Sequence, residues 1–105
     1  MNIGNPLLQR IKESVIATAP EAKLVLFGSY ARKQNAEGSD IDLLILVNQD
    51  MITWQEEKQI TYPIYDLEFE TGIQISLLVL SKKDWESKHK ITTFYENVMR
   101  DGIVL

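Results

Sequence analysis

The chain has no cysteine, a single histidine and no long apolar run. Without cysteine there is neither a disulfide framework nor a thiolate metal site. Residues 1–10 lack the apolar core of a signal peptide, and no later run approaches the ~20 apolar residues that span a bilayer. These absences predict a cytoplasmic protein with no membrane association.

The chain is also short of basic residues, with 11 Lys and Arg against 15 Asp and Glu and a net charge of -4. Nonspecific binding to nucleic acids depends on Lys and Arg contacts to phosphate. We therefore expect a protein rather than a nucleic acid as its macromolecular partner. The length of 105 residues suffices for one core, so we expect one domain over residues 1–105, without room for a second specificity module.

Apolar periodicity and turn residues predict alternating helices and strands. Pro63 lies within one predicted helix and should kink or split it, because proline lacks the backbone donor. Tyr62, Tyr65 and Phe69 share a face of that helix, which we assign to the core, with a partner surface as the alternative. The predicted helices cover residues 6–18, 53–71 and 92–101, with another from Ser81, and the predicted strands cover 22–27, 41–47 and 73–80.

Two aspartates one residue apart, Asp40 and Asp42, open the strand predicted over residues 41–47. Side chains alternate faces along a strand, so both carboxylates project to one side, about 7 Å apart at the backbone. They repel each other unless a cation lies between them. Mg²⁺ or Mn²⁺ suits the pair, because it takes one or two carboxylates and completes its shell with water and substrate phosphate. The pair indicates a nucleoside triphosphate substrate; an ordinary turn before a strand is the alternative.

Gly28 and Ser29 end the strand predicted over residues 22–27. Glycine lets the backbone approach an anion with no Cβ in the way. If a helical turn begins at Ser29, its free amide groups and the hydroxyl point at the same anion, and Arg32 lies in that turn. Oxyanion donors, a cation and two carboxylates would then converge. A plain strand exit with a helix cap is the alternative interpretation.

Taken together, these motifs resemble the signature of the DNA polymerase beta-type nucleotidyltransferases. The resemblance is strongest to the minimal nucleotidyltransferases of bacteria and archaea, and by length and element order it covers nearly the whole chain. It implies an α+β fold, with a short mixed sheet of three or more strands backed by helices. The residues that carry it are Gly28-Ser29-x-Ala31-Arg32 and then Ser39-Asp40-x-Asp42-Leu43.

The resemblance also implies a Mg²⁺-dependent transfer of a nucleoside monophosphate, AMP in the first place, from the triphosphate to a hydroxyl. ATP is then the expected substrate and Mg²⁺ or Mn²⁺ the cofactor. Minimal nucleotidyltransferases often accompany a helical HEPN-type protein, as antitoxins, so a partner of that type is implied. Carried over by position, the nucleotide-binding residues are Gly28, Ser29, Arg32 and Ser39, and the metal-binding and catalytic residues are Asp40 and Asp42.

Ser76 departs from the family pattern, because it stands where a later strand normally supplies a third carboxylate. A serine hydroxyl is neutral, a weak ligand for Mg²⁺ and no general base near neutral pH. Loss of a positioned general base typically costs ~100-fold to 10,000-fold in rate. Asp66, Glu68 or Glu70, which precede that strand, could supply a substitute, although solvated carboxylates on a helix is the simpler interpretation.

Three functions therefore remain open. The favoured one is an active nucleotidyltransferase, with Ser76 in place of the third carboxylate, that modifies a hydroxyl on a protein. The second is a weakened module that binds nucleotide and metal and neutralises a HEPN-type partner by contact. The third is a small α/β domain whose motifs are structural. The first two require Ser29, Asp40, Asp42 and Ser76 to line one cavity.

Overall fold

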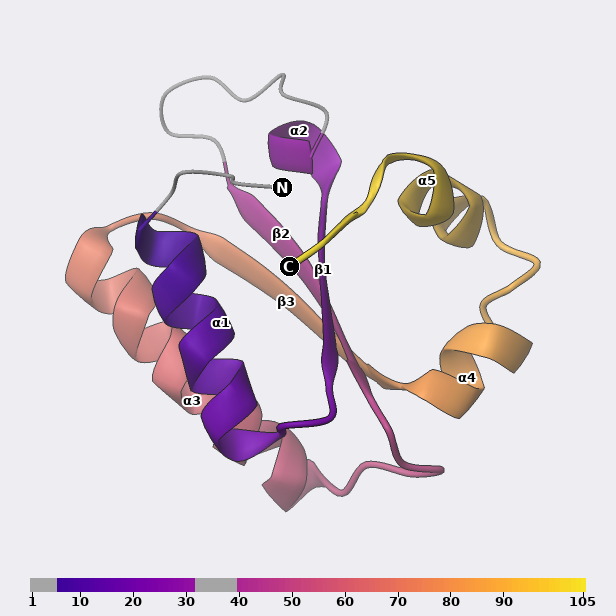
Figure 1. Ribbon diagram of the computed structural model, residues 1–105, viewed down its shortest axis with the longest axis horizontal. Coiled ribbons are helices and arrows are strands. Elements are labelled where there is room, and N and C mark those ends of the chain that lie inside the picture. The colour runs from indigo at the N-terminus through magenta and orange to yellow at the C-terminus, as the bar shows by residue number, and fades with distance from the viewer. Residues whose placement is uncertain (1–5, 32–39) are drawn as a thin grey trace.

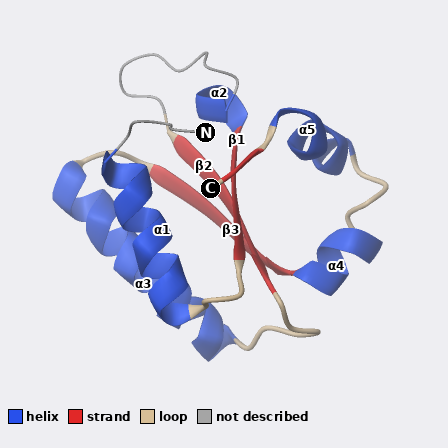
Figure 2. Cartoon of the chain, viewed as in Figure 1, coloured by secondary structure: helices blue, strands red, loops and turns tan. Residues whose placement is uncertain are grey.

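A computed structural model of the chain describes residues 6–31 and 40–105. In Figures 1 and 2, α1 and α3 lie side by side on one face of a sheet, while α4 and α5 cover the other face. The elements follow the order α1 (Pro6–Thr18), β1 (Lys23–Phe27), α2 (Gly28–Ala31), β2 (Ile41–Val47), α3 (Trp54–Thr71), β3 (Ile75–Ser81), α4 (Lys82–Ser87), α5 (Thr93–Asp101) and β4 (Ile103–Val104).

The sheet is mixed, with the strand order β3-β2-β1-β4 among the described residues. β1 runs antiparallel to both β2 and β4, and β2 runs parallel to β3. The predicted α+β fold, a short mixed sheet backed by helices, is confirmed. Ile103 and Val104, which lie outside the predicted strands, pair with β1 and add the fourth strand.

Alternation along β2 divides the core into two layers. Leu43 and Ile45 are buried against α1 and α3, together with Ile11 and Ile64. The intervening residues of β2 face the other layer, where Trp85 of α4 and Val98 of α5 are buried. Because side chains of a strand alternate, Asp42 shares the α4 and α5 side of the sheet with Leu44 and Leu46.

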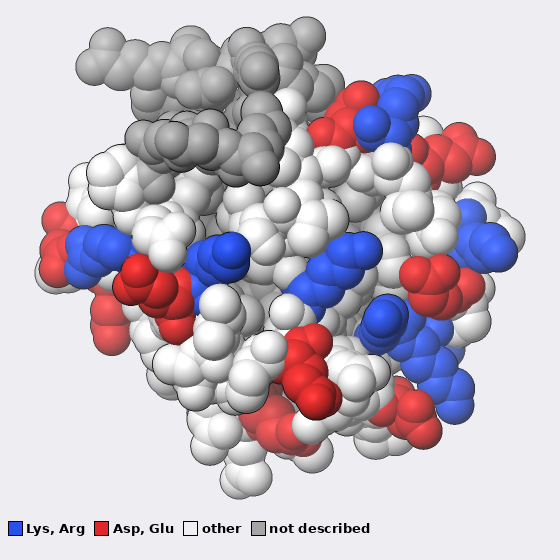
Figure 3. Space-filling model, in the orientation of Figure 1, with Lys and Arg blue, Asp and Glu red and all other residues white. Residues whose placement is uncertain are grey.

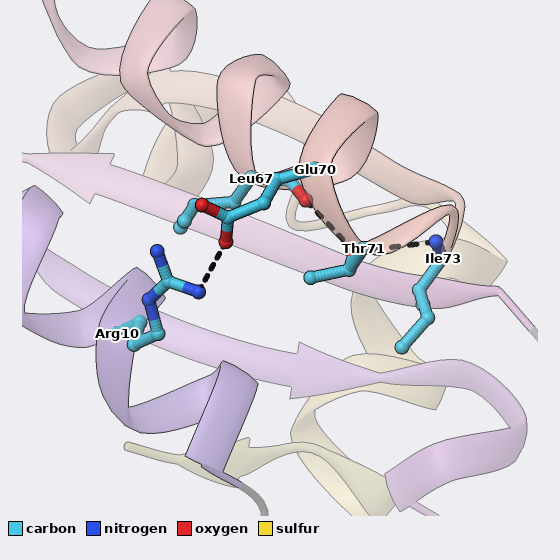
Figure 4. A network of polar contacts seen from close by, with 5 residues as sticks. All are labelled: Arg10, Leu67, Glu70, Thr71 and Ile73. Atoms are coloured by element: carbon cyan, nitrogen blue, oxygen red, sulfur yellow. Dashed lines mark hydrogen bonds and ion pairs between the residues drawn. The ribbon is translucent and has the colours of Figure 1, made fainter.

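An ion pair and a capped helix end join α1, α3 and the start of β3 (Figure 4). Arg10 of α1 pairs with Glu70 of α3, and this hydrogen bond, with the attraction between the charges, lowers the pKa of the Glu70 carboxyl. The hydroxyl of Thr71 donates to the carbonyl of Leu67 and accepts from the amide of Ile73. Helix α3 therefore ends in a fixed geometry that directs the chain into β3.

Of the kink or split predicted at Pro63, the split is wrong, since α3 is continuous over Trp54–Thr71. Its N-terminus is held by a capping box, in which the Thr53 hydroxyl accepts from the amide of Glu56 at 3.2 Å. Pro63 borders an open groove lined by residues of α1 and α3, and because it has no N–H it cannot donate to the carbonyl of Gln59. Buried Ile60 and Ile64 on either side of the proline keep the helix on the sheet.

The assignment of the aromatic face of α3 to the core is also wrong. Tyr62, Tyr65 and Phe69 are exposed, and Phe69 is 93% accessible. The opposite face of the helix, with Ile60 and Ile64, fills the space against the sheet. The helical spacing of Tyr62, Tyr65 and Phe69 groups them on one face, but it does not say which of two apolar faces turns toward the core.

Charged side chains of both signs are interspersed on the face of the molecule shown in Figure 3. On that face the described residues form no extended patch of a single sign, in keeping with the small excess of acidic residues over the whole chain. Within the described ranges, no helix is long and apolar enough to cross a bilayer.

The chain's two tryptophans provide a test of the packing. Trp85 is 2% exposed and contacts the rings of Phe94 and Tyr95, with centroids 5.8 and 4.7 Å away. We expect Trp85→Ala to lower the free energy of unfolding by ~3–5 kcal/mol, because it leaves a cavity. Trp54 is 69% exposed and contacts Lys58, so Trp54→Ala should cost at most ~1 kcal/mol. Urea denaturation followed by circular dichroism measures both, and equal losses would contradict the two-layer core.

Candidate active site

The backbone at Gly28 lies directly against the carboxylate of Asp42. The antiparallel register opposes Phe27 to Asp42, so the chain turns past this carboxylate as β1 ends. A Cβ added to Gly28 would lie 2.3 Å from Oδ2 of Asp42, and the φ of Gly28 is +75°. Both the contact and the dihedral require glycine, because other residues carry a Cβ and rarely adopt this conformation.

Ser76 is the neighbour of Asp42 on the other side. The parallel register opposes Asp42 to Ser76, and it is fixed at the strand start by the amide of Ile41, which donates to the carbonyl of Gln74 at 2.9 Å. Opposed residues of neighbouring strands project to the same face. The structure therefore brings Gly28, Asp42 and Ser76 together at one end of three adjacent strands, with Asp42 and Ser76 half-buried.

Asp40 immediately precedes β2 and is half-buried. It precedes Asp42 by two residues, so both carboxylates project to the same face of the extended chain. Within residues 6–31 and 40–105, no group of three or more His, Cys, Asp or Glu side chains could hold a metal ion. This end of the sheet thus offers a pair of carboxylates beside a serine.

Of the remaining predicted site residues, only Ser29 is among the described residues. Ser29 follows Gly28 in the short helix α2, which begins one residue earlier than the sequence pattern predicted, and its description is confined to the backbone. Arg32 and Ser39 lie outside the described residues. Their predicted roles in nucleotide binding stay predictions.

The three carboxylates considered as substitutes for the missing one lie on α3, across the sheet from Asp42. Glu70 pairs with Arg10, and Asp66 is exposed. Oε2 of Glu68 accepts from the amide of Ile75 at 2.6 Å. That amide points away from β2, so the Glu68 carboxylate binds at the outer edge of β3. The carboxylates of α3 therefore do not complete the pair at Asp42.

Sequence reasoning missed a small cavity that Gly28 helps to line. It has a volume of about 190 Å³ and is lined by Phe27, Phe94, Asn97 and Asp101, among others. Asn97 and Asp101 are one helical turn apart on α5, and they reach Gly28 because α5 packs on the sheet face of Asp42. Their spacing was a helix-face signal, but nothing local indicated that this face meets β1.

Comparison with known proteins assigns the chain to a family. Residues 8–100 match a family model described as "Nucleotidyltransferase domain". The chain belongs to the nucleotidyltransferase family. A relative from Methanocaldococcus jannaschii, named "Putative protein adenylyltransferase", is 34% identical over 83 residues, which cover 79% of this chain and 76% of the relative.

Two solved structures share the fold of this nucleotidyltransferase. A "putative nucleotidyltransferase" of Sulfolobus solfataricus aligns with a TM-score of 0.60 and 21% identity, over 93% of this chain and 75% of the other. A chain from a toxin-antitoxin structure with AMP-PNP aligns with a TM-score of 0.59 and 18% identity, over 99% of this chain and 72% of the other. At these identities the likeness concerns the fold.

The contact at Gly28 is tested by a matched pair of glycine substitutions. Gly72 has a φ of +72° with nothing within 4 Å of an added Cβ, so Gly72→Ala measures the backbone cost alone, ~1–2 kcal/mol. Gly28→Ala should lose more stability, because its Cβ must also displace the Asp42 carboxylate. Chemical denaturation compares the two variants. Equal losses would show that Asp42 is not confined by the Gly28 backbone.

Proposed function

We propose that this nucleotidyltransferase moves AMP from ATP to a hydroxyl on a partner protein. The contact between Gly28 and Asp42 carries the proposal, since it sets a glycine turn beside a carboxylate at the end of the sheet. The name of the relative from Methanocaldococcus jannaschii supports adenylyl transfer to protein, and the toxin-antitoxin neighbour with AMP-PNP supports an adenine nucleotide and a protein partner.

The donor set at Asp40 and Asp42 fits one Mg²⁺ ion. Carboxylate oxygens are hard ligands, and Mg²⁺ is typically held by one or two of them while water and substrate phosphates complete its shell. The bare backbone at Gly28 leaves the space beside Oδ2 of Asp42 free of a Cβ. When bound, the ion would neutralise charge that develops on the phosphate oxygens.

The chain's own residues would orient the reactants. The turn at Gly28 and Ser29 binds the triphosphate, with Arg32 and Ser39 as further nucleotide ligands. The acceptor oxygen forms a bond to the α-phosphorus, the bond between that phosphorus and the bridging oxygen breaks, and pyrophosphate leaves. Ser76 lies beside Asp42 and has a neutral hydroxyl, which does not take the acceptor proton, so that proton passes to water. Slow transfer follows from that arrangement.

A second candidate function is supported by the same serine. A site with two carboxylates and no third among the described residues can hold a nucleotide while transferring little. The chain would then act as an antitoxin-like module that neutralises a HEPN-type partner by contact. The toxin-antitoxin neighbour supports this alternative.

Label transfer separates the two functions. With α-labelled ATP, Mg²⁺ and the protein encoded beside this one as acceptor, we expect transfer that Asp42→Asn abolishes, because the variant loses a metal ligand. Asp66→Asn is the matched control, since Asp66 is exposed on α3 across the sheet, and it should keep full transfer. Saturable ATP binding without transfer would support the module. Absence of both binding and transfer would contradict the two functions together.

Restoring the third carboxylate tests the role of Ser76. Ser76→Asp places a charged oxygen ligand and base next to Asp42, and we expect the transfer rate to rise by ~100-fold or more. Ser76→Asn has a similar shape without the charge and should not raise the rate. Single-turnover kinetics measure both variants. Equal rates for the two variants would show that position 76 does not contact the reacting hydroxyl.

A further inference from the structure

The outer edge of β3 is a long, unpaired strand edge. Among the described residues, β3 is the terminal strand of the sheet and pairs with β2 alone. It is seven residues long, Ile75–Ser81, whereas β4 at the opposite edge has two residues. An edge strand presents a row of backbone donors and acceptors that another strand can complete.

The parallel register shows which backbone groups face outward. The amide of Ile41 donates to the carbonyl of Gln74, so even-numbered residues of β3 bond to β2. Odd-numbered residues then point their N–H and C=O groups away from the sheet. The amide of Ile75 is met by Glu68 at 2.6 Å. Leu77 and Val79, further along, carry the outward groups at the centre of the strand.

Beyond Ile75, whose amide is met by Glu68, this edge lacks the features that usually prevent pairing. Proteins protect edges with charges, proline, bulges or very short strands. The strand Ile-Ser-Leu-Leu-Val-Leu-Ser has no charge and no proline along its length. Leu78, at its midpoint, is 37% exposed on the α4 and α5 side. β3 therefore offers both unpaired backbone groups and an exposed apolar side chain to a partner strand.

We propose that β3 pairs with β3 of a second copy of this chain, antiparallel and centred on Leu78, joining the two sheets into one. In this register Leu77 of each copy lies opposite Val79 of the other. Both residues point outward, so they form the hydrogen-bonded type of antiparallel pair and exchange both bonds. The two Leu78 side chains meet at the symmetry axis. A two-fold axis makes such a patch self-complementary.

The charges at the two ends of β3 favour this partner. Glu68 lies at the start of the strand, against the amide of Ile75. Lys82 and Lys83 follow the end of the strand and are exposed. Antiparallel pairing brings the acidic end of one copy to the basic end of the other, twice over. A parallel pairing would set like charges together. A second copy always has the same acidic and basic ends, whereas an unrelated strand need not have them.

The pairing has a consequence for the site, although it does not depend on the proposed function. In the register centred on Leu78, Ser76 of one copy lies opposite Leu80 of the other. The second copy would then cover the outer edge of β3 at Ser76, next to Asp42. Lys82 of the second copy would follow, near the strand end that carries Gln74. An acceptor hydroxyl would approach Asp42 from above the joined sheet rather than around its edge.

Sedimentation equilibrium over a range of protein concentrations tests the pairing. We expect the full chain to reach twice its 12.1 kDa mass. Leu77→Pro removes an outward N–H without removing a bond to β2, so it should fold and raise the dimer dissociation constant at least about tenfold. Leu77→Ala shortens the same side chain but keeps the N–H, and it is the matched control. If Leu77→Pro does not fold, Leu78→Lys places two ammonium groups at the axis and should likewise yield monomers.

Amide hydrogen exchange by NMR reads the same contact directly. In the dimer the amides of Leu77 and Val79 should be protected along with those of Ser76, Leu78 and Leu80. Dilution should remove protection from Leu77 and Val79 but leave that of Ser76, Leu78 and Leu80. The proposal is overturned if the chain stays at 12.1 kDa with unprotected Leu77 and Val79 amides, if those amides become protected only when a different protein is added, or if Leu77→Pro dimerises as well as Leu77→Ala.

Discussion

The close approach of the Gly28 backbone to the Asp42 carboxylate is the constraint on which the site depends. Two ladders of backbone hydrogen bonds set it, since β1 opposes Phe27 to Asp42 and β3 opposes Ser76 to the same residue. A shift of one residue in either register would turn the side chains of a whole strand to the other face. The position of the site is thus fixed by the same pairing that fixes the core.

β2 holds this position because it is buried on both faces. Six of its residues are buried, and Asp42, its one polar residue, is half-buried near the strand start. Moving Asp42 along the strand would bury its charge within an apolar layer of the core, which costs free energy. The site consequently lies at the end of the sheet, where a carboxylate can keep contact with water and with a substrate.

The sequence predicted the local features and missed those that depend on packing between distant segments. The bounds of β2 follow from its continuous apolar run, and the proximity of Gly28 to Asp42 was expected from two motifs at strand ends. β4 was missed because two apolar residues carry no periodicity, and its strand exists through β1. The exposed face of α3 was assigned to the core because both of its faces carry apolar residues. The cavity at Asn97 and Asp101 depends on where α5 packs, which no local pattern encodes.

Ser76 leaves the candidate site with two carboxylates where the family pattern has three. The family pattern led us to expect a third carboxylate at the position that the structure places beside Asp42, and the carboxylates of α3 lie across the sheet from it. A pair of carboxylates beside a glycine turn fits the metal ion and the triphosphate of the proposed function. Among the described residues, no third carboxylate joins the pair in a group that could hold a metal ion.

Paramagnetic broadening by Mn²⁺ tests the central claim, that nucleotide and metal bind where Gly28 meets Asp42. With a non-hydrolysable ATP analogue and Mn²⁺ added to the labelled protein, we expect the amide signals of Gly28, Asp42 and Ser76 to broaden first. The amides of Lys23 and Leu46, which pair at the opposite end of the same strands, should stay sharp. Broadening that is equal at both ends of the sheet, or absent at Gly28, would contradict the account.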